Sequence, residues 1–597
     1  MIEDFGMRVL PAMSAREQAT GLRSLAAVLL LAALLASPGE AGAQAGGTRS
    51  AQASDQPAGK ASARQRGKDA VKAGGEAAPG AGEAIYRRGV LGSGAPLTAL
   101  REAGGRMSGA AAACINCHRR SGFGAKEGRI SIPPVTGRYL FRPRASISVD
   151  ADIPYVASMR GEREPYTDAT LARAIREGLD SEGKPLNYLM PNFDLGDADM
   201  VALIAYLKSL DHRRVPGVSD TELHFATIVT PDADPAKRRG MLDVMEKFFT
   251  DRNSRQMVAA PRMRSSSKTS LAKSMFMVHR QWKLHVWELT GAEATWGEQL
   301  ERHLAREPVL AVVSGVGGRS WEPVHAFCER SALPCLFPNV EAPPKQADHD
   351  FYSLYFSRGV LLEADLIANR ILKASGGEAV KSVHQVYRAG DSGEAGAGAL
   401  AAALEQQGIK AVGHVVKSGT AGVAEALRKT AGADALVLWL RPDDLAALGD
   451  APAAPSEVYL SGIMGGLENA PLPSSWREHA HMAYPFDLAE RRRVRVDFAL
   501  GWFRIRKIPV VAAQVQADTY LTLGLISETL NHMVDTFVRD YLVERIEDTL
   551  AHRVVTGYYP HLAMATGQRF GSKGGYVVRF AEPTGNRVVA EQDWITP

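Results

Sequence analysis

The chain has 597 residues, of which 45% are hydrophobic and 23% are charged, and its formal net charge is +4. One hydrophobic core does not extend over that length, so we expect at least two domains, each with a sizeable interior. The composition is that of an ordinary soluble protein, and so small a net charge gives no indication of nucleic-acid binding.

The N-terminal segment, residues 1–45, predicts a signal peptide. Arg16 and Arg23 precede an apolar run of twelve residues from Leu25 to Ala36, and small residues then offer cleavage positions after Ala43 or Ala45. A membrane-spanning helix needs about 20 apolar residues, so we expect cleavage rather than an uncleaved anchor. The mature protein is therefore expected to be periplasmic.

Residues 46–81 predict a disordered linker, because they are rich in Gly, Ala, Ser and charged residues and almost free of large apolar side chains. Such a segment buries too little apolar surface to offset the entropy lost on ordering. A compact unit follows at residues 82–212. A polar stretch then separates it from a second domain at residues 221–597.

In the second domain, short β-rich runs alternate with helical runs. Expected strands lie at 224–230, 283–289 and 309–315, and expected helices follow them at 235–253, 295–306 and 321–331. After Tyr352 the alternation resumes, with helices at 359–374, 395–407 and 421–430 and strands at 382–387, 411–416, 435–440, 457–461 and 481–485. This order predicts parallel strands with right-handed crossovers, and its two sets predict two α/β lobes. Long helices between 487 and 550 and a β-rich tail at 574–580 complete the domain.

Two of the four cysteines lie in the motif Cys114-Ile115-Asn116-Cys117-His118. Covalent haem attachment requires this spacing, because one helical turn sets the two thiols at the separation of the porphyrin vinyl groups and the adjacent histidine faces the iron. A zinc site would need a second ligand pair nearby. A thioredoxin-like dithiol would need a βαβ context instead of this Gly-rich, helical one. The motif therefore favours haem.

The second axial ligand of an electron carrier is expected to be a thioether sulfur, which stabilises ferrous iron and closes the sixth position. Met190 is the candidate, because it precedes a proline in an irregular loop and an apolar-periodic helix begins soon after, at Asp197. Met107 and Met159 remain alternatives, whereas Met200 lies inside that helix and is expected in the core.

Residues 82 to about 211 resemble a class I cytochrome c. The resemblance rests on the helix GEAIYRRG, the CINCH motif, the pair Pro133–Pro134, the loop LMPNF and the closing helix DADMVALIAYLKSL. It implies a small all-α domain with one low-spin haem c. That haem is bound covalently through Cys114 and Cys117, with His118 and Met190 as the ligands of the metal. One departure from compact members is the insertion at residues 90–113, between the first helix and the motif.

The same resemblance implies further contacts and a function. The carbonyl of Pro133 or Pro134 would orient the histidine, and the closing helix would cross the first helix with Tyr206 against Ile85 or Tyr86. The function implied is one-electron transfer rather than an enzymatic reaction. The redox partner would be a dehydrogenase, an oxidase or another cytochrome.

A basic cluster surrounds the haem motif, and it consists of Arg119, Arg120, Lys126 and Arg129. Two interpretations remain open. The cluster is either a docking face that steers an acidic redox partner or ordinary surface charge.

Residues from about 221 to 596 resemble type I periplasmic ligand-binding proteins, especially those that bind branched-chain amino acids for ABC transporters. The resemblance rests on FATIVTPDADPAKRRGMLDVMEKFF, EPVLAVVSGVGG, ALPCLFPNV and the late helices from FALGWF onward. It implies a cleft between two lobes that holds a small ligand at helix N-termini, with an ABC permease as a further partner.

The candidate ligand-binding residues form two groups. Ser314, Arg319 and Ser320 would line the cleft from the first lobe, and Asp391 and Ser392 from the second. Glycine-rich turns after strands are common in any α/β fold, so a purely structural role remains the alternative. The sequence does not name the ligand.

The remaining cysteines, Cys328 and Cys335, are seven positions apart at the end of an expected helix and the start of the next strand. In an oxidising compartment such a pair is expected to form a local disulfide rather than two free thiols. His325 lies one helical turn before Cys328, so a catalytic cysteine is the alternative.

Together these features predict an exported fusion of a monohaem c-type cytochrome with a two-lobed α/β ligand-binding domain. An alternative is an ABC-transporter-type solute receptor whose haem domain acts as a redox sensor. A haem enzyme is a third alternative, and it would need an open sixth position on the iron.

Overall fold

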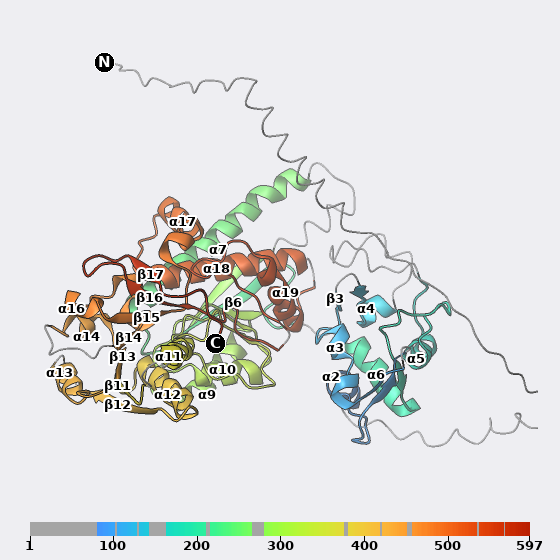
Figure 1. Cartoon of the computed structure of the whole chain (residues 1–597). Coiled ribbons are helices and arrows are strands. Elements are labelled where there is room, and N and C mark those ends of the chain that lie inside the picture. Colours follow the sequence, from blue (N-terminus) through green and yellow to red (C-terminus); the bar gives the residue numbers. More distant parts are fainter. Residues whose placement is uncertain are drawn as a thin grey trace, which may run out of the picture. The chain divides into compact units, whose positions relative to one another are not determined.

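The computed structural model describes residues 80–101, 104–127, 130–141, 163–210, 215–264, 280–374, 380–417, 419, 421–449, 457–533, 536–565 and 567–597. The predicted signal peptide, most of the predicted linker, Met159 and Arg129 lie outside these residues. We call residues 80–210 the first domain and residues 215–597 the second domain. Their elements are labelled in Figure 1.

The first domain combines five helices with short strands among its described residues. The helices are α2 (Ala81–Arg88), α3 (Ile115–His118), α4 (Gly137–Leu140), α5 (Asp168–Glu177) and α6 (Asp197–Ser209). An antiparallel sheet of order β2-β1-β5 joins β1 (Thr98–Leu100), β2 (Arg106–Ser108) and β5 (Asn192–Asp194), and β3 (Ala125–Glu127) pairs with β4 (Ile130–Ile132).

The prediction of an all-α first domain is therefore incomplete. Strands β1 and β2 belong to the insertion at residues 90–113, which folds back on itself with Gly104 in a left-handed conformation, at φ 85°. A left-handed turn of this kind is easily adopted by glycine. The hairpin then pairs through β1 with β5, which follows the Met190 loop, so the insertion is ordered against the predicted ligand loop.

Helices α2 and α6 cross at very close range. A Cβ atom placed on Gly82 would lie 2.1 Å from the carbonyl oxygen of Ala202, so only glycine permits this approach. The rings of Tyr86 and Tyr206 pack beside the crossing, with centroids 5.4 Å apart. This is the helix crossing that the sequence predicts, with Tyr86 in the contact.

The first lobe of the second domain is built on a five-stranded parallel sheet of order β10-β9-β8-β6-β7. Its strands are β6 (Glu222–Val229), β7 (Gln281–Glu288), β8 (Ala311–Val313), β9 (Cys335–Leu336) and β10 (Ser353–Leu354). The helices between them are α7 (Pro235–Arg264), α9 (Trp296–Arg306) and α10 (Glu322–Arg330).

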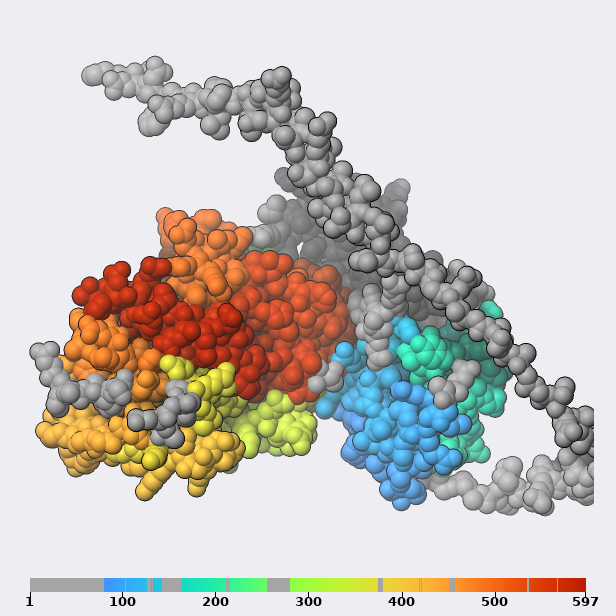
Figure 2. All heavy atoms as spheres, viewed as in Figure 1, coloured from blue at the N-terminus to red at the C-terminus, as the bar shows by residue number. Residues whose placement is uncertain are grey.

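The second lobe is built on a seven-stranded sheet of order β12-β11-β13-β14-β15-β16-β17. Its first five strands are parallel: β11 (Ser382–Arg388), β12 (Lys410–Val416), β13 (Ala435–Trp439), β14 (Glu457–Ser461) and β15 (Ala480–Tyr484). The C-terminal strands β16 (Tyr576–Phe580) and β17 (Val588–Ala590) are antiparallel additions. In Figure 2 the C-terminal residues, in red, accordingly lie against the orange and yellow residues of this lobe.

The remaining described helices complete the second domain. They are α11 (Val360–Ala374), α12 (Ser392–Glu405), α13 (Ala421–Arg428), α14 (Pro442–Ala446), α15 (Gly462–Gly465), α16 (Ser474–Arg477), α17 (Ala489–Arg506), α18 (Ala513–Met533) and α19 (Arg539–His552). The parallel sheets and the two lobes match the prediction from the sequence.

Strand β13 shows why a continuous apolar run forms a central strand here. All five of its residues are buried, and successive side chains point to opposite faces of a sheet. Val437 and Trp439 therefore pack into the core that includes α11 and α12, whereas Leu436 and Leu438 pack into the core on the other face. A strand covered on both faces has no polar alternation.

Within the part of the chain that the structure describes, every helix is too short or too polar to cross a membrane.

Replacing Gly82 with alanine is expected to lower the free energy of unfolding of the first domain by about 1–3 kcal/mol, because the added methyl group forces α2 away from α6. Urea-dependent hydrogen exchange of peptides from α2 and α6 in the full chain measures this effect. The control is Gly105→Ala, where a Cβ atom meets nothing within 4 Å. Equal stability of the two variants would contradict the crossing described above.

Candidate functional site

A cavity of about 570 Å³ lies inside the first domain. Its wall includes the four side chains predicted to bind the cofactor: Cys114, Cys117, His118 and Met190. The structure therefore brings together residues that are up to 76 positions apart in the sequence. Most of the remaining wall is apolar, with contributions from Ile132, Leu140, Leu186, Phe193, Leu203 and Leu207 among others.

His118 is held in one orientation and one tautomer. Its ring is buried, and its Nδ1 atom lies 3.0 Å from the carbonyl oxygen of Pro133. Because a carbonyl oxygen only accepts, Nδ1 must donate its proton, which leaves the lone pair of Nε2 available to a metal. Burial lowers the pKa of His118, and the Pro133 carbonyl opposes that change. The sequence predicts this contact with either proline of the pair, and the structure selects Pro133.

The cysteines of the motif lie at the same wall. Cys114 immediately precedes α3, and the single helical turn from Cys114 to His118 is closed by the hydrogen bond from the His118 N–H to the Cys114 carbonyl. Burial raises the pKa of the Cys114 thiol to about 12. A reactive redox dithiol instead needs a lowered thiol pKa, so this environment disfavours the dithiol alternative.

Met190 lies in a turn, where its N–H donates to the carbonyl of Asn187. Met107, on β2, lines the same cavity, so both methionines are candidates by position. Met200 is buried in the hydrophobic core beside α6, as expected. The β1–β2 insertion is what brings Met107 to the cavity, and its length in the sequence was the only signal that this could happen.

The cavity suits a haem. Its volume lies within the range of roughly 300–1,000 Å³ that is usual for small-molecule and cofactor sites. Two thiols and an oriented imidazole on a mostly apolar wall are the donor set of a c-type haem site.

The two predicted walls of the ligand cleft lie in the second domain, one on each lobe. Ser314 follows β8 in a left-handed conformation, at φ 55°, and its side chain is buried. Its Oγ atom accepts a hydrogen bond from Asn339 at 2.9 Å and lies 3.2 Å from Oγ1 of Thr519, on α18. A non-glycine residue in this conformation is strained and persists only where the surrounding structure requires it.

The other predicted cleft residues also bond within the protein. The Arg319 N–H donates to Asp232 at 2.9 Å, and the Ser320 hydroxyl donates to Glu293 at 2.6 Å. In the second lobe, Asp391 caps α12 by accepting from the Ser392 N–H at 2.7 Å. Ser392 is buried, and its hydroxyl has no hydrogen-bond partner among the described residues.

An ion-pair network that the sequence analysis missed connects the two lobes. Arg441 lies two residues after the second-lobe strand β13. It donates to both carboxylate oxygens of Glu341 at 2.9 and 2.7 Å and to Asp391 at 2.6 and 3.0 Å. Glu341 follows the first-lobe strand β9 and also accepts from Lys237 of α7 at 2.5 Å. The sequence signal that could have predicted this network is the presence of charged residues shortly after buried strands, as in WLRPDD and FPNVEAPP.

The predicted walls meet at this network. Gly390, next to Asp391, leaves room for the guanidinium of Arg319 from the first lobe. If residue 390 had a side chain, its Cβ atom would lie 3.0 Å from Nη1 of Arg319. Of the predicted cleft residues, Arg319 and Asp391 therefore lie where the two lobes meet.

Comparison with known proteins identifies the first domain. Residues 103–211 match the family model described as cytochrome c. This segment is a cytochrome c domain. Such a domain implies haem c as its cofactor, in agreement with the cavity described above. No curated protein matches the chain.

Solved structures similar to this chain include the three that follow. A fatty acid ABC transporter substrate-binding protein from Thermomonospora curvata is 13% identical, covers 64% of this chain and 95% of its own, and has a TM-score of 0.43. A branched-chain amino acid ABC transporter from Thermus thermophilus with bound valine is 11% identical. The match covers 64% of this chain and 98% of that protein, with a TM-score of 0.44. A leucine-binding protein from Thermotoga maritima is 11% identical. The match covers 63% of this chain and 99% of that protein, with a TM-score of 0.41.

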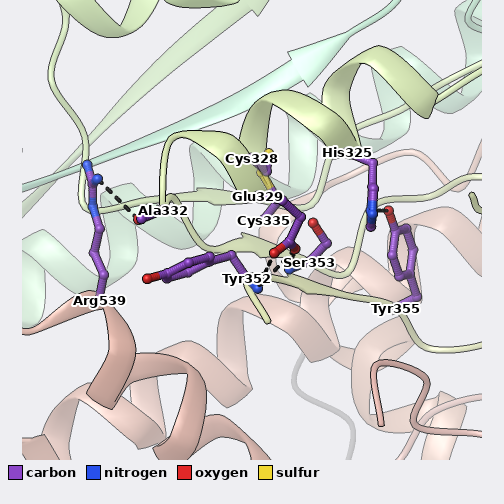
Figure 3. Close-up of a disulfide and its surroundings, with 9 residues drawn as sticks. All are labelled: His325, Cys328, Glu329, Ala332, Cys335, Tyr352, Ser353, Tyr355 and Arg539. Atoms are coloured by element: carbon purple, nitrogen blue, oxygen red, sulfur yellow. Dashed lines mark hydrogen bonds between the residues drawn. A yellow bond between two sulfur atoms is a disulfide. The ribbon is translucent and has the colours of Figure 1, made fainter. Parts of the chain in front are cut away.

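The second cysteine pair belongs to the second domain. Cys328 of α10 and Cys335 of β9 are joined by their sulfur atoms, with Cα atoms 6.2 Å apart. Figure 3 shows His325 turned toward Tyr355 rather than toward the sulfur. Its two nitrogens lie 3.0 Å from the Tyr355 hydroxyl and 3.1 Å from Asp350. This arrangement does not support a catalytic cysteine–histidine pair.

Replacing Met190 with alanine in the haem-loaded protein is expected to leave the haem attached and to change the ferric and ferrous visible spectra, because a thioether ligand is lost. The matched control is Met107→Ala, which removes the same side chain from the same cavity. A spectral change in the Met107 variant alone would assign the sixth ligand to Met107.

Protonation of Glu341 at low pH is expected to lower the free energy of unfolding of the second domain. Burial alone would raise its pKa, but Lys237 and Arg441 lower it from 4.5 to about 2. The carboxylate therefore contributes its full stabilisation above pH 4.5 and loses it as the pH falls toward 2, a loss of roughly 3 kcal/mol at 1.36 kcal/mol per pH unit. Urea denaturation of the second domain between pH 6 and pH 2 measures this loss, and Glu341→Gln should reduce the slope.

Proposed function

We propose that the protein is an exported monohaem c-type cytochrome that transfers single electrons, fused to a two-lobed domain that holds a small ligand. One observation carries this proposal. A single cavity of the cytochrome domain gathers Cys114, Cys117 and His118, and the Pro133 carbonyl fixes His118 so that Nε2 is free to bind a metal.

Each residue of the cavity has a separate role in the proposal. Cys114 and Cys117 would attach the haem through thioether bonds, and His118 and Met190 would bind the iron from its two sides. When bound, the haem supplies an iron that alternates between the ferric and ferrous states. The apolar wall limits the access of water, and such shielding influences the reduction potential.

We propose an electron carrier rather than an enzyme, because two protein ligands would occupy both axial positions of the iron. Electrons would then be exchanged with a partner protein, such as a dehydrogenase, an oxidase or another cytochrome. Export to the periplasm is part of the proposal, because the N-terminal segment has the pattern of a cleavable signal peptide. An oxidising compartment also suits the disulfide between Cys328 and Cys335.

A second candidate function makes the second domain primary. The protein would be a solute receptor for an ABC permease, and its haem would act as a redox sensor. The observation that favours this candidate is the meeting of the two lobes at Arg319, Asp391 and Arg441, where ion pairs join strand ends of both sheets. A ligand-dependent change in reduction potential would support the receptor, and an unchanged potential with rapid electron exchange would support the carrier.

The double variant Cys114→Ser/Cys117→Ser is expected to lose its covalent haem, because hydroxyl side chains do not form the thioether bonds. Intact-mass spectrometry and reduced-minus-oxidised spectra of the protein purified from its native host measure the loss. The matched control is Cys328→Ser/Cys335→Ser, which should retain one haem per chain. A wild-type protein whose mass equals that of the bare polypeptide would refute the proposed function.

A further inference from the structure

The residues that follow the haem motif lie against helix α19 of the second domain. Both domains belong to one compact unit, Gly74–Pro597. Ser121, only 2% exposed, donates its N–H to Oε1 of Glu544 at 3.0 Å. Its hydroxyl lies 2.5 Å from Oε2 of the same carboxyl group. Glu544 is itself only 7% exposed. The two residues are 423 positions apart, so this contact is purely tertiary.

Acidic residues of α19 lie opposite arginine residues of the cytochrome domain. Asp540, Glu544 and Glu547 are spaced four and three residues apart, which places them on one face of α19. Arg119 lies 3.9 Å from Glu547, and Arg120 lies 3.6 Å from Asp540. Arg87, from the last turn of α2, also reaches Asp540, at 3.3 Å. The acidic face of the helix therefore fits the basic residues of the cytochrome domain.

Apolar contacts complete the interface. The ring of Phe123 packs on the ring of Tyr541, with centroids 4.5 Å apart. The guanidinium of Arg120 lies over the rings of Phe351 and Tyr352, at 4.6 and 5.1 Å from their centroids. Such cation–π contacts are stronger in a partly desolvated setting. Phe123 belongs to the same hydrophobic cluster as the interior of the second domain.

Helix α19 is anchored to the first lobe at its N-terminal end. Arg539 donates to the carbonyl oxygens of Ala332 at 3.3 Å and Val309 at 2.6 Å, and the first of these bonds is drawn in Figure 3. The Tyr352 hydroxyl donates to Asp540 at 2.5 Å. The acidic face is thus held in place by the second domain, independently of the cytochrome residues that it contacts.

We infer that the acidic face of α19 is an internal docking site for the haem motif of the cytochrome domain. The acidic partner that suits Arg119 and Arg120 is then this chain's own second domain. An external redox partner must approach the cytochrome domain on another face. This inference goes beyond the proposed function and does not require that the haem transfer electrons.

The decisive variants are at Glu544. Burial raises the pKa of Glu544 to about 8, against the opposing hydrogen bonds from Ser121. The carboxyl group is then mostly protonated at neutral pH, and glutamine has nearly the same shape and hydrogen-bonding capacity. Glu544→Gln should therefore preserve docking. Glu544→Lys places a cation beside Arg119 and should abolish docking.

Hydrogen exchange of the full-length, haem-loaded protein tests the inference. In Glu544→Lys we expect exchange at least ten-fold faster than in wild type in two peptides, one containing residues 119–123 and one containing residues 351–352. Glu544→Gln should match wild type. The control Asp548→Lys changes the same helix by the same type of substitution, at a residue that pairs with Arg545, and should leave both peptides unchanged.

Unchanged exchange of both peptides in Glu544→Lys would overturn the inference. If this variant does not fold, Arg120→Glu tests the same contact from the cytochrome side, and it should accelerate exchange in residues 351–352 and in α19. Visible spectra of each variant keep this result separate from the proposed function, because undocking changes exchange while the attached haem persists.

Discussion

The close crossing of α2 and α6 is the constraint on which the cytochrome domain depends. Gly82 permits the approach because no side chain separates it from the Ala202 carbonyl. The crossing aligns Tyr86 with Leu203 and Leu207, and these three side chains line the cavity that also contains the haem motif. Residues of α6 and of the Met190 loop both belong to the wall of this cavity. Without the crossing, the apolar wall would lose its support, and His118 and Met190 would no longer face a common space.

Glu341 at the meeting of the lobes and Glu544 at the interface of the domains have opposite pKa shifts. At the meeting of the lobes, Arg441 satisfies two carboxylates, and the pKa of Glu341 falls to about 2 because the cations compensate for its burial. At the interface of the domains, burial of Glu544 dominates and its pKa rises to about 8. At neutral pH the Glu341 carboxyl group is therefore ionised, and the Glu544 carboxyl group is mostly protonated. The first stabilises through ion pairing and the second mainly through hydrogen bonds, which is the distinction expected when desolvation and nearby cations compete.

The interface also gives Arg119 and Arg120 of the basic cluster acidic partners within the same chain. Arg119 and Arg120 are adjacent to the haem motif and suit an acidic surface, which is how external redox partners are usually steered. In this chain their acidic neighbours belong to α19. The same helix packs on α18, where the Thr529 and Thr549 hydroxyls lie 3.4 Å apart, and Thr519 of α18 lies 3.2 Å from Ser314, one of the predicted cleft residues. The haem motif and this predicted cleft residue thus contact two helices that pack on each other.

The sequence by itself determined the features whose cause is local. The spacing of Cys114, Cys117 and His118 lies within one helical turn, and the strand–helix alternation after residue 221 follows from side-chain periodicity along single elements. Both were predictable because the interacting residues are neighbours in the chain. Tertiary structure decided the rest. It selected Pro133 rather than Pro134, brought Met107 and Met190 to the wall of the same cavity, added strands to the cytochrome domain, joined Arg441 to Glu341, and placed Ser121 on Glu544. These contacts join residues from 15 to 423 positions apart, and no pattern within one element specifies which distant surface will cover a buried charge.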